Sequence, residues 1–504
     1  MDLPPPAAPT RPPRWTLAAA AALLGLIVYA VALIGHVGAS AGGSDSSGYL
    51  NHARLLAAGR LHLPERVLPG LAADHTPPFL YIPLGFRPAP NGQGMVPTYP
   101  SGLPLFILAL APVVGWRHAG DTVLVLHSLA GLLTTYWLGR TFGLGRRASA
   151  LAVAMVGLSP LYFFMSLQAM SDLPSLVWTT LAVIAAMRSG RRPAWALATG
   201  FALGVDVLLR PANFLAFVPV AAALGASPRR WGLVLLGGLP GATFFAFHSL
   251  AAYGQVATTG YGDSSWAFRL AYVPETLVHY LRWLPALLSP LVLAAVGLPW
   301  ARREPLRHRW ILALWVIAYA AFYSAYKNTH ESWWYLRFLL PAAPALAVAA
   351  LLVGRAILAA PHSPAARWPW PRATAAGVVA LAALWGARRL HPFSVGDEEL
   401  RYERISRWLQ SHLPANAVCL AKQESGALVY FTNFTFLRWD EVRPGDGPAI
   451  EAALRQAGRP LYAVLFQFEL AEEPILQDRL PGDWKTVGTV EDVVVSRRDD
   501  PGRP

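Results

Sequence analysis

The sequence predicts a polytopic α-helical membrane protein with a small α/β domain at its C-terminal end. Of its 504 residues, 54% are hydrophobic and only 14% are charged. A soluble protein needs more polar surface than this, so most of the chain must face lipid or other buried helices. Apolar runs of about 20 residues, the length that crosses a bilayer, recur along the first four fifths of the chain. The remainder, from residue 391, has the composition of a soluble domain.

The apolar runs predict about eleven to thirteen transmembrane helices. The first run follows Arg11 and Arg14 and is longer than the apolar part of a signal peptide, so we expect it to be retained as a span. Gly and Pro interrupt several runs, which membrane helices tolerate. The eleven runs cover residues 15–37, 121–139, 148–166, 173–188, 194–209, 211–226, 231–252, 277–300, 310–326, 336–360 and 373–390.

The distribution of arginine predicts the orientation of these spans. The formal charge is +13, and the arginines cluster in short gaps between apolar runs, as at Arg229/Arg230 and Arg367/Arg372. Such gaps normally face the cytoplasm. The short run 101–116 fits this pattern only as a re-entrant or interfacial helix on the outer face. We therefore expect the N-terminus inside and the C-terminus outside.

Three parts follow from this orientation. Residues 1–14 form a cytoplasmic tail, residues 15–390 the transmembrane domain and residues 391–504 a periplasmic α/β domain. Within the second part, residues 38–120 form a large first outer loop with helical stretches. The C-terminal part combines an amphipathic helix with short apolar strands. These elements are expected at 397–413 for the helix and at 417–421, 461–466, 487–490 and 492–496 for the strands.

The chain lacks the common motifs of soluble enzymes. It contains no P-loop, no GxGxxG, no HExxH and no GxSxG sequence. Its one cysteine, Cys419, excludes an intramolecular disulfide framework and a cysteine-based metal cluster, and we expect it to be buried in a strand. Ionisable residues near a membrane are costly and usually functional, which directs attention to the outer ends of the spans.

Six stretches carry a resemblance to a known family. They occur, in the order found in that family, at 44–61 (SDSSGYLNHARLLAAGRL), 98–110, 158–183, 200–219, 258–262 (TTGYG) and 333–344 (WWYLRFLLPAAP). Together they resemble the GT-C glycosyltransferases, especially the family-39 group that includes protein O-mannosyltransferases and the aminoarabinose transferase of lipid A. Each motif alone is weak, and their order carries the resemblance.

The resemblance implies an integral membrane glycosyltransferase. Such enzymes move a sugar from a polyprenyl-phosphate carrier to a glycan, lipid or protein acceptor at the outer face. Asp45 would be the general base of an inverting reaction and Asp172 a second catalytic acid, while Arg210 and Arg337 would bind the donor phosphate. We expect no cofactor, no metal and no nucleic-acid partner. The substrate-proximal residues would be Tyr49, His52, Tyr99, Asp263, His330 and Glu331.

The chain departs from the family pattern at two places. Many relatives have a second acid directly after the first, where this chain has Ser46. Some have Lys or His beside the proline of the next motif, where this chain has Tyr99 before Pro100. These departures leave the assignment of Asp45 intact. They leave open which sugar and which acceptor are used.

Simpler roles are available for the same residues. Asp45 and Asp172 could cap the helices that follow them. Asp206 and Arg210, four residues apart, could form an ion pair within one helix. Arg337 beside Trp333, Trp334 and Tyr335 could anchor the chain in an interfacial aromatic belt. His52, His75 and His330 with Glu331 have no recognised metal-ligand spacing, and Asp263 could be a plain loop residue.

Two other function classes stay open at this point. A transporter or lipid flippase would place acids and bases deep in the bilayer, whereas here most lie at the ends of spans. A catalytically inactive scaffold of the same fold is compatible with any resemblance of fold. The arginine-rich, cysteine-poor composition favours a bacterial inner membrane, with the active site facing the periplasm.

Overall fold

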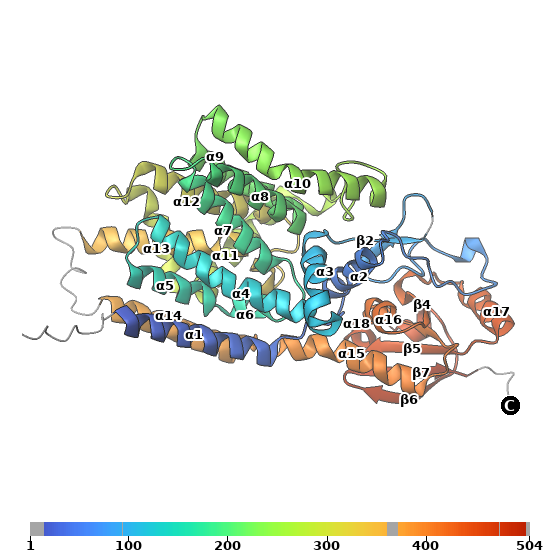
Figure 1. Ribbon diagram of the computed structural model, residues 1–504. Coiled ribbons are helices and arrows are strands. Elements are labelled where there is room, and N and C mark those ends of the chain that lie inside the picture. Colours follow the sequence, from blue (N-terminus) through green and yellow to red (C-terminus); the bar gives the residue numbers. More distant parts are fainter. Residues whose placement is uncertain (1–14, 93, 360–370, 473, 500–504) are drawn as a thin grey trace, which may run out of the picture.

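The computed structural model describes residues 15–92, 94–359, 371–472 and 474–499. A bundle of helices occupies one end and an α/β domain the other, with part of residues 38–120, the predicted first outer loop, beside their junction (Figure 1). The predicted tail 1–14 and Arg367 lie outside the described residues. The predicted fold class is confirmed, because a helical bundle with spanning helices is joined to a small C-terminal sheet.

The bundle consists of thirteen α-helices and several 3₁₀ segments among the described residues. Trp315, Tyr162 and Tyr319 are fully buried at its centre. The elements are α1 Trp15–His36, α3 Gly102–Val114, α4 Trp116–Thr141, α5 Arg146–Gly157, α6 Pro160–Ser166, α7 Asp172–Arg188, α8 Ala194–Leu209, η2 Pro211–Ala216, α9 Phe217–Leu224, α10 Pro228–Tyr253, η3 Ser265–Ala267, η4 Leu270–Tyr272, α11 Val273–Leu288, η5 Pro290–Trp300, α12 Leu306–Ser324, η6 Trp333–Ala342, α13 Ala343–Leu358 and α14 Pro371–Leu390.

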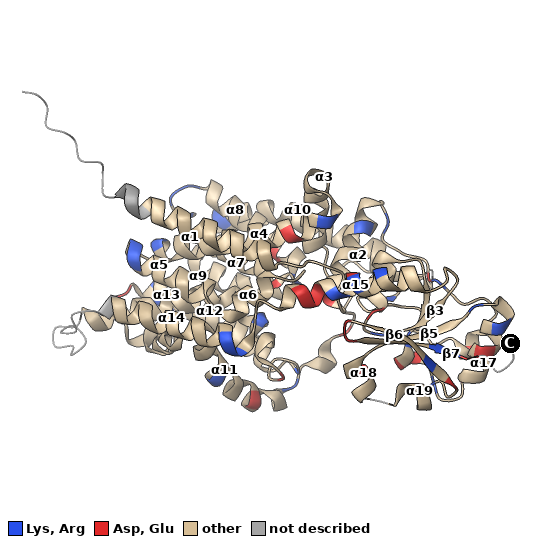
Figure 2. Ribbon diagram, turned by 90° about the horizontal axis from the view of Figure 1, so that it is seen from below, with Lys and Arg blue, Asp and Glu red and all other residues tan. Residues whose placement is uncertain are grey.

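Four described helices are long and apolar enough to cross a membrane, and six segments are if each of two bent pairs counts as one span. The four are Ala19–His36, Trp116–Thr141, Pro228–Tyr253 and Trp333–Leu358. Helix α1 leaves Leu23, Val28 and Ile34 more than half exposed, as expected of a helix that faces lipid. Figure 2 shows little charge along the middle of the bundle and acidic residues where it meets the C-terminal domain.

Breaks and short helices both reduce the number of segments that pass below the eleven predicted spans; α7 and α8, for example, have only 17 and 16 residues. The predicted span 148–166 is the pair α5 and α6, bent by 65°, and the span predicted at 277–300 is bent by 113° between α11 and η5. Ser289 at the second bend has a φ of +85° and precedes Pro290, which disfavours helical backbone. The run 101–116 is the separate short helix α3, which ends at Gly115 with a φ of +78°.

The first outer loop consists of a helix and a small hairpin. Helix α2 (Asp45–Ala57) packs against α3, and η1 (Ala73–His75) follows it. Strands β1 (Phe86–Pro88) and β2 (Met95–Pro97) then pair antiparallel. Nine of the residues of α2 are buried although the helix is only weakly apolar, because protein covers it on more than one side.

The C-terminal domain is a five-stranded mixed sheet flanked by helices. Its strand order is β4-β3-β5-β7-β6, with β3 parallel to β4 and β5, and β7 antiparallel to β5 and β6. All predicted strands and the predicted amphipathic helix are present, and β4 is an additional strand. The elements are α15 Val395–His412, β3 Val418–Leu420, α16 Ser425–Phe431, β4 Thr435–Leu437, η8 Trp439–Glu441, α17 Gly447–Ala457, β5 Leu461–Phe466, α18 Gln467–Glu472, α19 Ile475–Asp478, β6 Trp484–Val490 and β7 Val493–Arg498.

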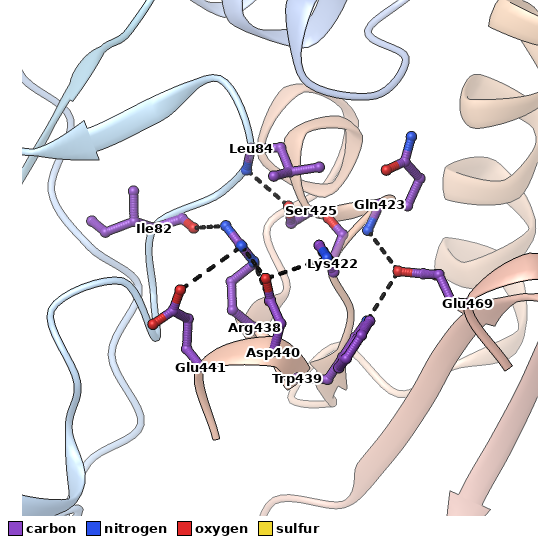
Figure 3. Close-up of polar contacts among 10 residues, drawn as sticks. All are labelled: Ile82, Leu84, Lys422, Gln423, Ser425, Arg438, Trp439, Asp440, Glu441 and Glu469. Atoms are coloured by element: carbon purple, nitrogen blue, oxygen red, sulfur yellow. Dashed lines mark hydrogen bonds and ion pairs between the residues drawn. The ribbon is translucent and has the colours of Figure 1, made fainter. Parts of the chain in front are cut away.

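Polar contacts fix this domain against the first outer loop (Figure 3). The guanidinium of Arg438 donates to the carbonyl of Ile82 at 3.3 Å and is held by Asp440. The N–H of Leu84 donates to Ser425 Oγ at 3.0 Å. These bonds satisfy backbone groups of the loop that would otherwise be buried without partners.

The C-terminal domain also forms direct hydrogen bonds with helix α2. Asn51 Nδ2 donates to the carbonyl of Gly426 at 3.1 Å, and Arg54 donates to the carbonyl of Tyr430 at 2.8 Å. The Arg54 guanidinium also lies 3.5 Å from the centre of the Tyr430 ring, a cation–π contact. Helix α2 is therefore held between the bundle and the C-terminal domain.

Candidate active site

Two aspartate–arginine pairs meet where the bundle adjoins the first outer loop. Asp45 Oδ2 lies 2.9 Å from Arg337 Nη2, and Asp172 forms an ion pair with Arg210. The four side chains are between 3% and 21% exposed, so both pairs are shielded from bulk water. They come from α2, η6, α7 and the end of α8, which the sequence separates widely. The structure thus brings together the four residues predicted to act on the donor and acceptor.

Both aspartates are the first residue of a helix and not its cap. Ser44 precedes α2 and Ser171 precedes α7, and neither serine makes a capping hydrogen bond. The carboxylates of Asp45 and Asp172 form ion pairs with Arg337 and Arg210 instead. A negative charge in the first turn of a helix is favoured by the helix dipole. This placement favours a role in the site over the capping role that the sequence left open.

The arginines are held by backbone geometry and by a shared aromatic ring. Arg210 follows α8 with extended backbone (φ −149°, ψ 115°), because Pro211 disfavours a helical residue before it. Arg337 lies within η6. The guanidinium carbons of Arg210 and Arg337 lie 5.2 and 5.3 Å from the centre of the Phe338 ring. Phe338 therefore places both cations around one centre.

Arg337 keeps hydrogen-bonding capacity for a further anion. Within the described part of the chain, its Nη1 donates only to the weak acceptor Met170 Sδ, at 3.3 Å. Its Nε is buried and has no hydrogen-bond partner among the described residues. A guanidinium has five donors in a planar fork, and a phosphate could occupy those that Asp45 does not use.

Three tyrosines form one wall of the site. Tyr49 OH is 2.9 Å from Ser171 Oγ, and Tyr99 OH is 2.8 Å from Ser44 Oγ, so each hydroxyl lies next to a residue that precedes an aspartate. The rings of Tyr49 and Tyr99 are 5.1 Å apart, and Tyr261 packs edge-on against Tyr99. Burial raises the pKa of Tyr49 and of Tyr99, and the charge of Asp45 raises both further. These hydroxyls therefore stay neutral.

The ion pair between Asp206 and Arg210, considered from the sequence, is replaced by another arrangement. Asp206 is fully buried and accepts hydrogen bonds from Thr179 Oγ1 at 2.5 Å and Asn213 Nδ2 at 2.6 Å. Arg210 lies beyond the end of α8 and pairs with Asp172. Asp206 thus has a local structural role in the bundle.

His52 is buried in α2 and faces His248, with the two Nε2 atoms 3.1 Å apart. Burial, together with the neighbouring His248, lowers the pKa of His52 to about 3. His52 is therefore neutral at physiological pH and packs beneath the site. Among the described residues, no group of three His, Cys, Asp or Glu side chains could hold a metal ion.

The remaining predicted residues lie in the loops around the site. Asp263 is exposed and accepts from the N–H of Ser265 at 2.9 Å, and with Arg87 it lines a cavity of about 480 Å³. His330 Nε2 lies 3.2 Å from Glu275. Glu331 accepts from Asn328 Nδ2 at 3.1 Å. His330 and Glu331 thus contact the first turn of α11 and a loop residue, and not the two Asp–Arg pairs.

Glu399, an acid from the C-terminal domain, was not predicted from the sequence as a site residue. It lies on α15, and its Oε2 is buried close to Gly42, three residues before Asp45. Burial, partly offset by the Ser46 hydroxyl and reinforced by the charge of Asp45, raises the pKa of Glu399 to about 8. The amphipathic pattern of α15 shows which face is buried but not what it meets.

Comparisons with solved structures identify the fold. ArnT from Cupriavidus metallidurans, crystallised with undecaprenyl phosphate, aligns with a TM-score of 0.60 at 15% identity over 95% of this chain and 98% of that one. The Archaeoglobus fulgidus oligosaccharyltransferase aligns with a TM-score of 0.51 at 13% identity, over 88% of this chain and 69% of that one. The mycobacterial arabinofuranosyltransferase AftD aligns with a TM-score of 0.51 at 15% identity. That alignment covers 98% of this chain and 40% of AftD.

No protein-family model and no curated protein sequence matches the chain. At identities this low, the likeness shows a common fold. The predicted resemblance to GT-C membrane glycosyltransferases is confirmed at that level, and the ArnT alignment spans both the bundle and the C-terminal domain.

Proposed function

We propose that this protein is an inverting glycosyltransferase that moves a sugar from a polyprenyl-phosphate donor to an acceptor at the periplasmic face of the membrane. The observation that carries the proposal is the pair of Asp–Arg contacts at one junction, with Asp45 against Arg337 and Asp172 against Arg210. The likeness to ArnT, whose structure contains undecaprenyl phosphate, supports the class of donor. The arginine-rich gaps between apolar runs support the orientation.

The two arginines are the proposed site for the donor phosphate. Arginine binds phosphate oxygens through paired N–H groups and stays charged at all physiological pH values. A phosphate that engages Arg337 competes with Asp45 for the same guanidinium. Donor binding therefore loosens the 2.9 Å ion pair and frees the carboxylate for the acceptor.

The reaction is a single displacement at the anomeric carbon. The acceptor oxygen attacks C1 from the face opposite the phosphate, and the bond from C1 to the phosphate oxygen breaks. Asp45 takes the proton of the acceptor hydroxyl, while the electron pair of the broken bond leaves with the polyprenyl phosphate. Arg210 and Arg337 stabilise the negative charge that develops on that phosphate. Asp172 keeps Arg210 in place and partly balances its charge.

The acceptor approaches from the loop side in this proposal. The cavity of about 480 Å³ lined by Arg87, Thr258, Thr259 and Asp263 adjoins Gly260 and Tyr261, and Tyr261 packs on Tyr99. Its hydroxyl, guanidinium and carboxylate groups are of the kind that hydrogen-bond to sugars and other polar acceptors.

Transfer from radiolabelled polyprenyl-phosphate sugars, in reconstituted membranes with bacterial envelope acceptors, tests the proposal. Wild-type protein should transfer label, Asp45→Asn should lose it, and Asp74→Asn should retain it. Asp74 is a suitable control because it lies in the same loop with its side chain 78% exposed. The anomeric configuration of the product, determined by NMR, checks inversion. A folded wild-type protein that transfers nothing from any carrier would reject the proposal in favour of a transporter or an inactive scaffold.

A further inference from the structure

The first turns of α15 lie against the linker between α1 and α2 with no side chains between the backbones. A Cβ atom added to Gly396 would lie 1.8 Å from the carbonyl oxygen of His36, and one added to Gly38 would lie 2.0 Å from the carbonyl oxygen of Gly396. Both distances are far below van der Waals contact, so only glycine permits this approach. The approach fixes where the next turn of α15 places its side chains.

That next turn places Glu399 beside the segment that leads into α2. A Cβ atom on Gly42 would lie 2.7 Å from Glu399 Oε2, so the absence of a side chain at Gly42 leaves the room that this carboxyl occupies. Ser46, the residue after Asp45, is 1% exposed and lies on the same side. Glu399 Oε2 and Ser46 Oγ are both buried beside each other, with the backbone N–H of Gly42 also facing the carboxyl, and neither oxygen makes a hydrogen bond of good geometry among the described residues.

A buried carboxyl oxygen without a hydrogen bond of good geometry costs free energy and calls for an explanation. The charged neighbours of Glu399 do not supply one. Arg401 on the same helix forms an ion pair with Asp492 at 2.9 Å, and Asp45 is bound to Arg337. Tyr402, the other titratable neighbour on α15, is engaged by Gln423 Nε2 at 3.0 Å.

We propose that Glu399 is a positioning residue for Asp45: the C-terminal domain inserts this carboxyl beside α2 and so completes the transfer site with a second acid. The inference rests on the proposed glycosyl transfer. In its protonated form, Glu399 donates a hydrogen bond towards the Asp45 carboxylate when that carboxylate leaves Arg337. Asp45 is then held as an oriented anion, ready to receive the acceptor proton.

The ionisation of Glu399 gives this role a pH dependence with a defined sign. Its pKa is raised from the ordinary glutamate range to about 8, so the neutral, donating form prevails below pH 8. Above that pH a second negative charge appears beside Asp45 and close to the cations that bind the donor phosphate. Donor binding should then weaken for two reasons. The ionised Glu399 partly neutralises the positive charge of those arginines, and it repels the negatively charged donor phosphate.

The test measures kcat and donor KM for full-length protein between pH 6 and pH 9.5. Wild type should show a rise in donor KM above about pH 8. Glu399→Gln keeps a neutral hydrogen-bond donor and cannot ionise, so it should retain activity at pH 7 and show no such rise. Glu399→Ala should lose about tenfold or more in kcat at pH 7, the loss expected for removal of one hydrogen bond to a charged group.

Glu398→Gln is the matched control, because Glu398 is the exposed neighbour on α15 and should behave as wild type. The inference is overturned if Glu399→Gln keeps the same alkaline rise in KM, or if folded Glu399→Ala equals wild type. Where Glu399→Ala does not fold, the pH profile of Glu399→Gln decides alone. A folded wild type that transfers no sugar rejects the proposed function together with this inference, whereas insensitivity at Glu399 in an active enzyme rejects only the latter.

Discussion

The carboxylate of Asp45 lies 2.9 Å from the guanidinium of Arg337, so the proposed general base and the proposed phosphate ligand are each other's partners. One residue begins a helix of the first outer loop, and the other lies in a 3₁₀ segment near the end of the bundle. The contact implies an exchange of partners on donor binding. It also makes the effects of mutating the two residues interdependent.

Substitution of Arg337 should weaken donor binding. Arg337→Lys keeps the charge but loses the planar guanidinium, and we expect the donor KM to rise about tenfold. Arg337→Ala should weaken donor binding by about 2–4 kcal/mol, because it also leaves Asp45 without its cation. Inhibition by added undecaprenyl phosphate measures the same site. Arg282→Ala, at an exposed position on α11, serves as the control. Equal inhibition constants in wild type and Arg337→Ala would exclude Arg337 from the phosphate site.

The Asp172–Arg210 pair should contribute to folding as well as to activity. Its side chains are 3% and 16% exposed, so Asp172→Asn leaves a largely buried guanidinium uncompensated and should cost about 3–5 kcal/mol of stability. The double variant Asp172→Asn with Arg210→Met should recover part of that loss while remaining inactive. Thermal unfolding in detergent follows the stability. Additive losses in the double variant would show that the pair is not coupled.

Tyr49 should be needed more for alignment than for chemistry. Tyr49→Phe removes the 2.9 Å hydrogen bond to Ser171 and so loosens the contact between the starts of α2 and α7. We expect a loss of about 1 kcal/mol in stability and a fall in kcat of several-fold, with donor KM little changed. Ser171→Ala removes the same bond from the other side and should give the same pattern. Divergent kinetics of the two variants would argue against a shared role.

The close approach of Gly396 to His36 should be intolerant of any side chain. Gly396→Ala places a methyl group where the structure leaves no room and should displace the start of α15, with loss of transfer and faster proteolysis between the bundle and the C-terminal domain. Gly377→Ala is the matched control, because an added Cβ atom on α14 meets nothing within 4 Å. Unchanged activity in Gly396→Ala would show that the contact is not needed for the site.

The orientation can be tested with thiol labelling. The native Cys419 is buried, so a cysteine introduced at an exposed position reports its own side of the membrane. A membrane-impermeant maleimide added to intact cells with a permeabilised outer membrane should label Asp483→Cys in the C-terminal domain. It should label Arg191→Cys, between α7 and α8, only after lysis. The reverse pattern would invert the predicted topology.

The sequence allowed the fold class and the four residues of the two Asp–Arg pairs to be predicted, for different reasons. Apolar runs of spanning length report the membrane directly, whereas Asp45, Asp172, Arg210 and Arg337 were selected by the order of their motifs and their positions at the ends of spans. Which acid pairs with which arginine was not predictable, because the Asp206–Arg210 spacing fitted a helical pair equally well. Tertiary contacts with Thr179 and Asn213 decided that question.

Other features depend on long-range packing and left no local signal. The 113° bend after α11 depends on Ser289 and Pro290 within a run that is mostly apolar. Glu399 was hidden because one buried face of an amphipathic helix looks the same whether it covers a sheet, a bundle or a reactive centre.

Only four residues, 391–394, separate the last helix of the bundle from α15. This short connection gives the soluble part little freedom to drift away from the membrane part. A chain cut after Leu390 would keep every candidate spanning helix, yet it would lose the support of α2 along with Glu399. We therefore expect such a truncated protein to insert into membranes normally and to be inert. The bundle and the C-terminal domain differ in composition, but we expect activity to need both. An exchange of domains between relatives must therefore carry α2 and α15 together.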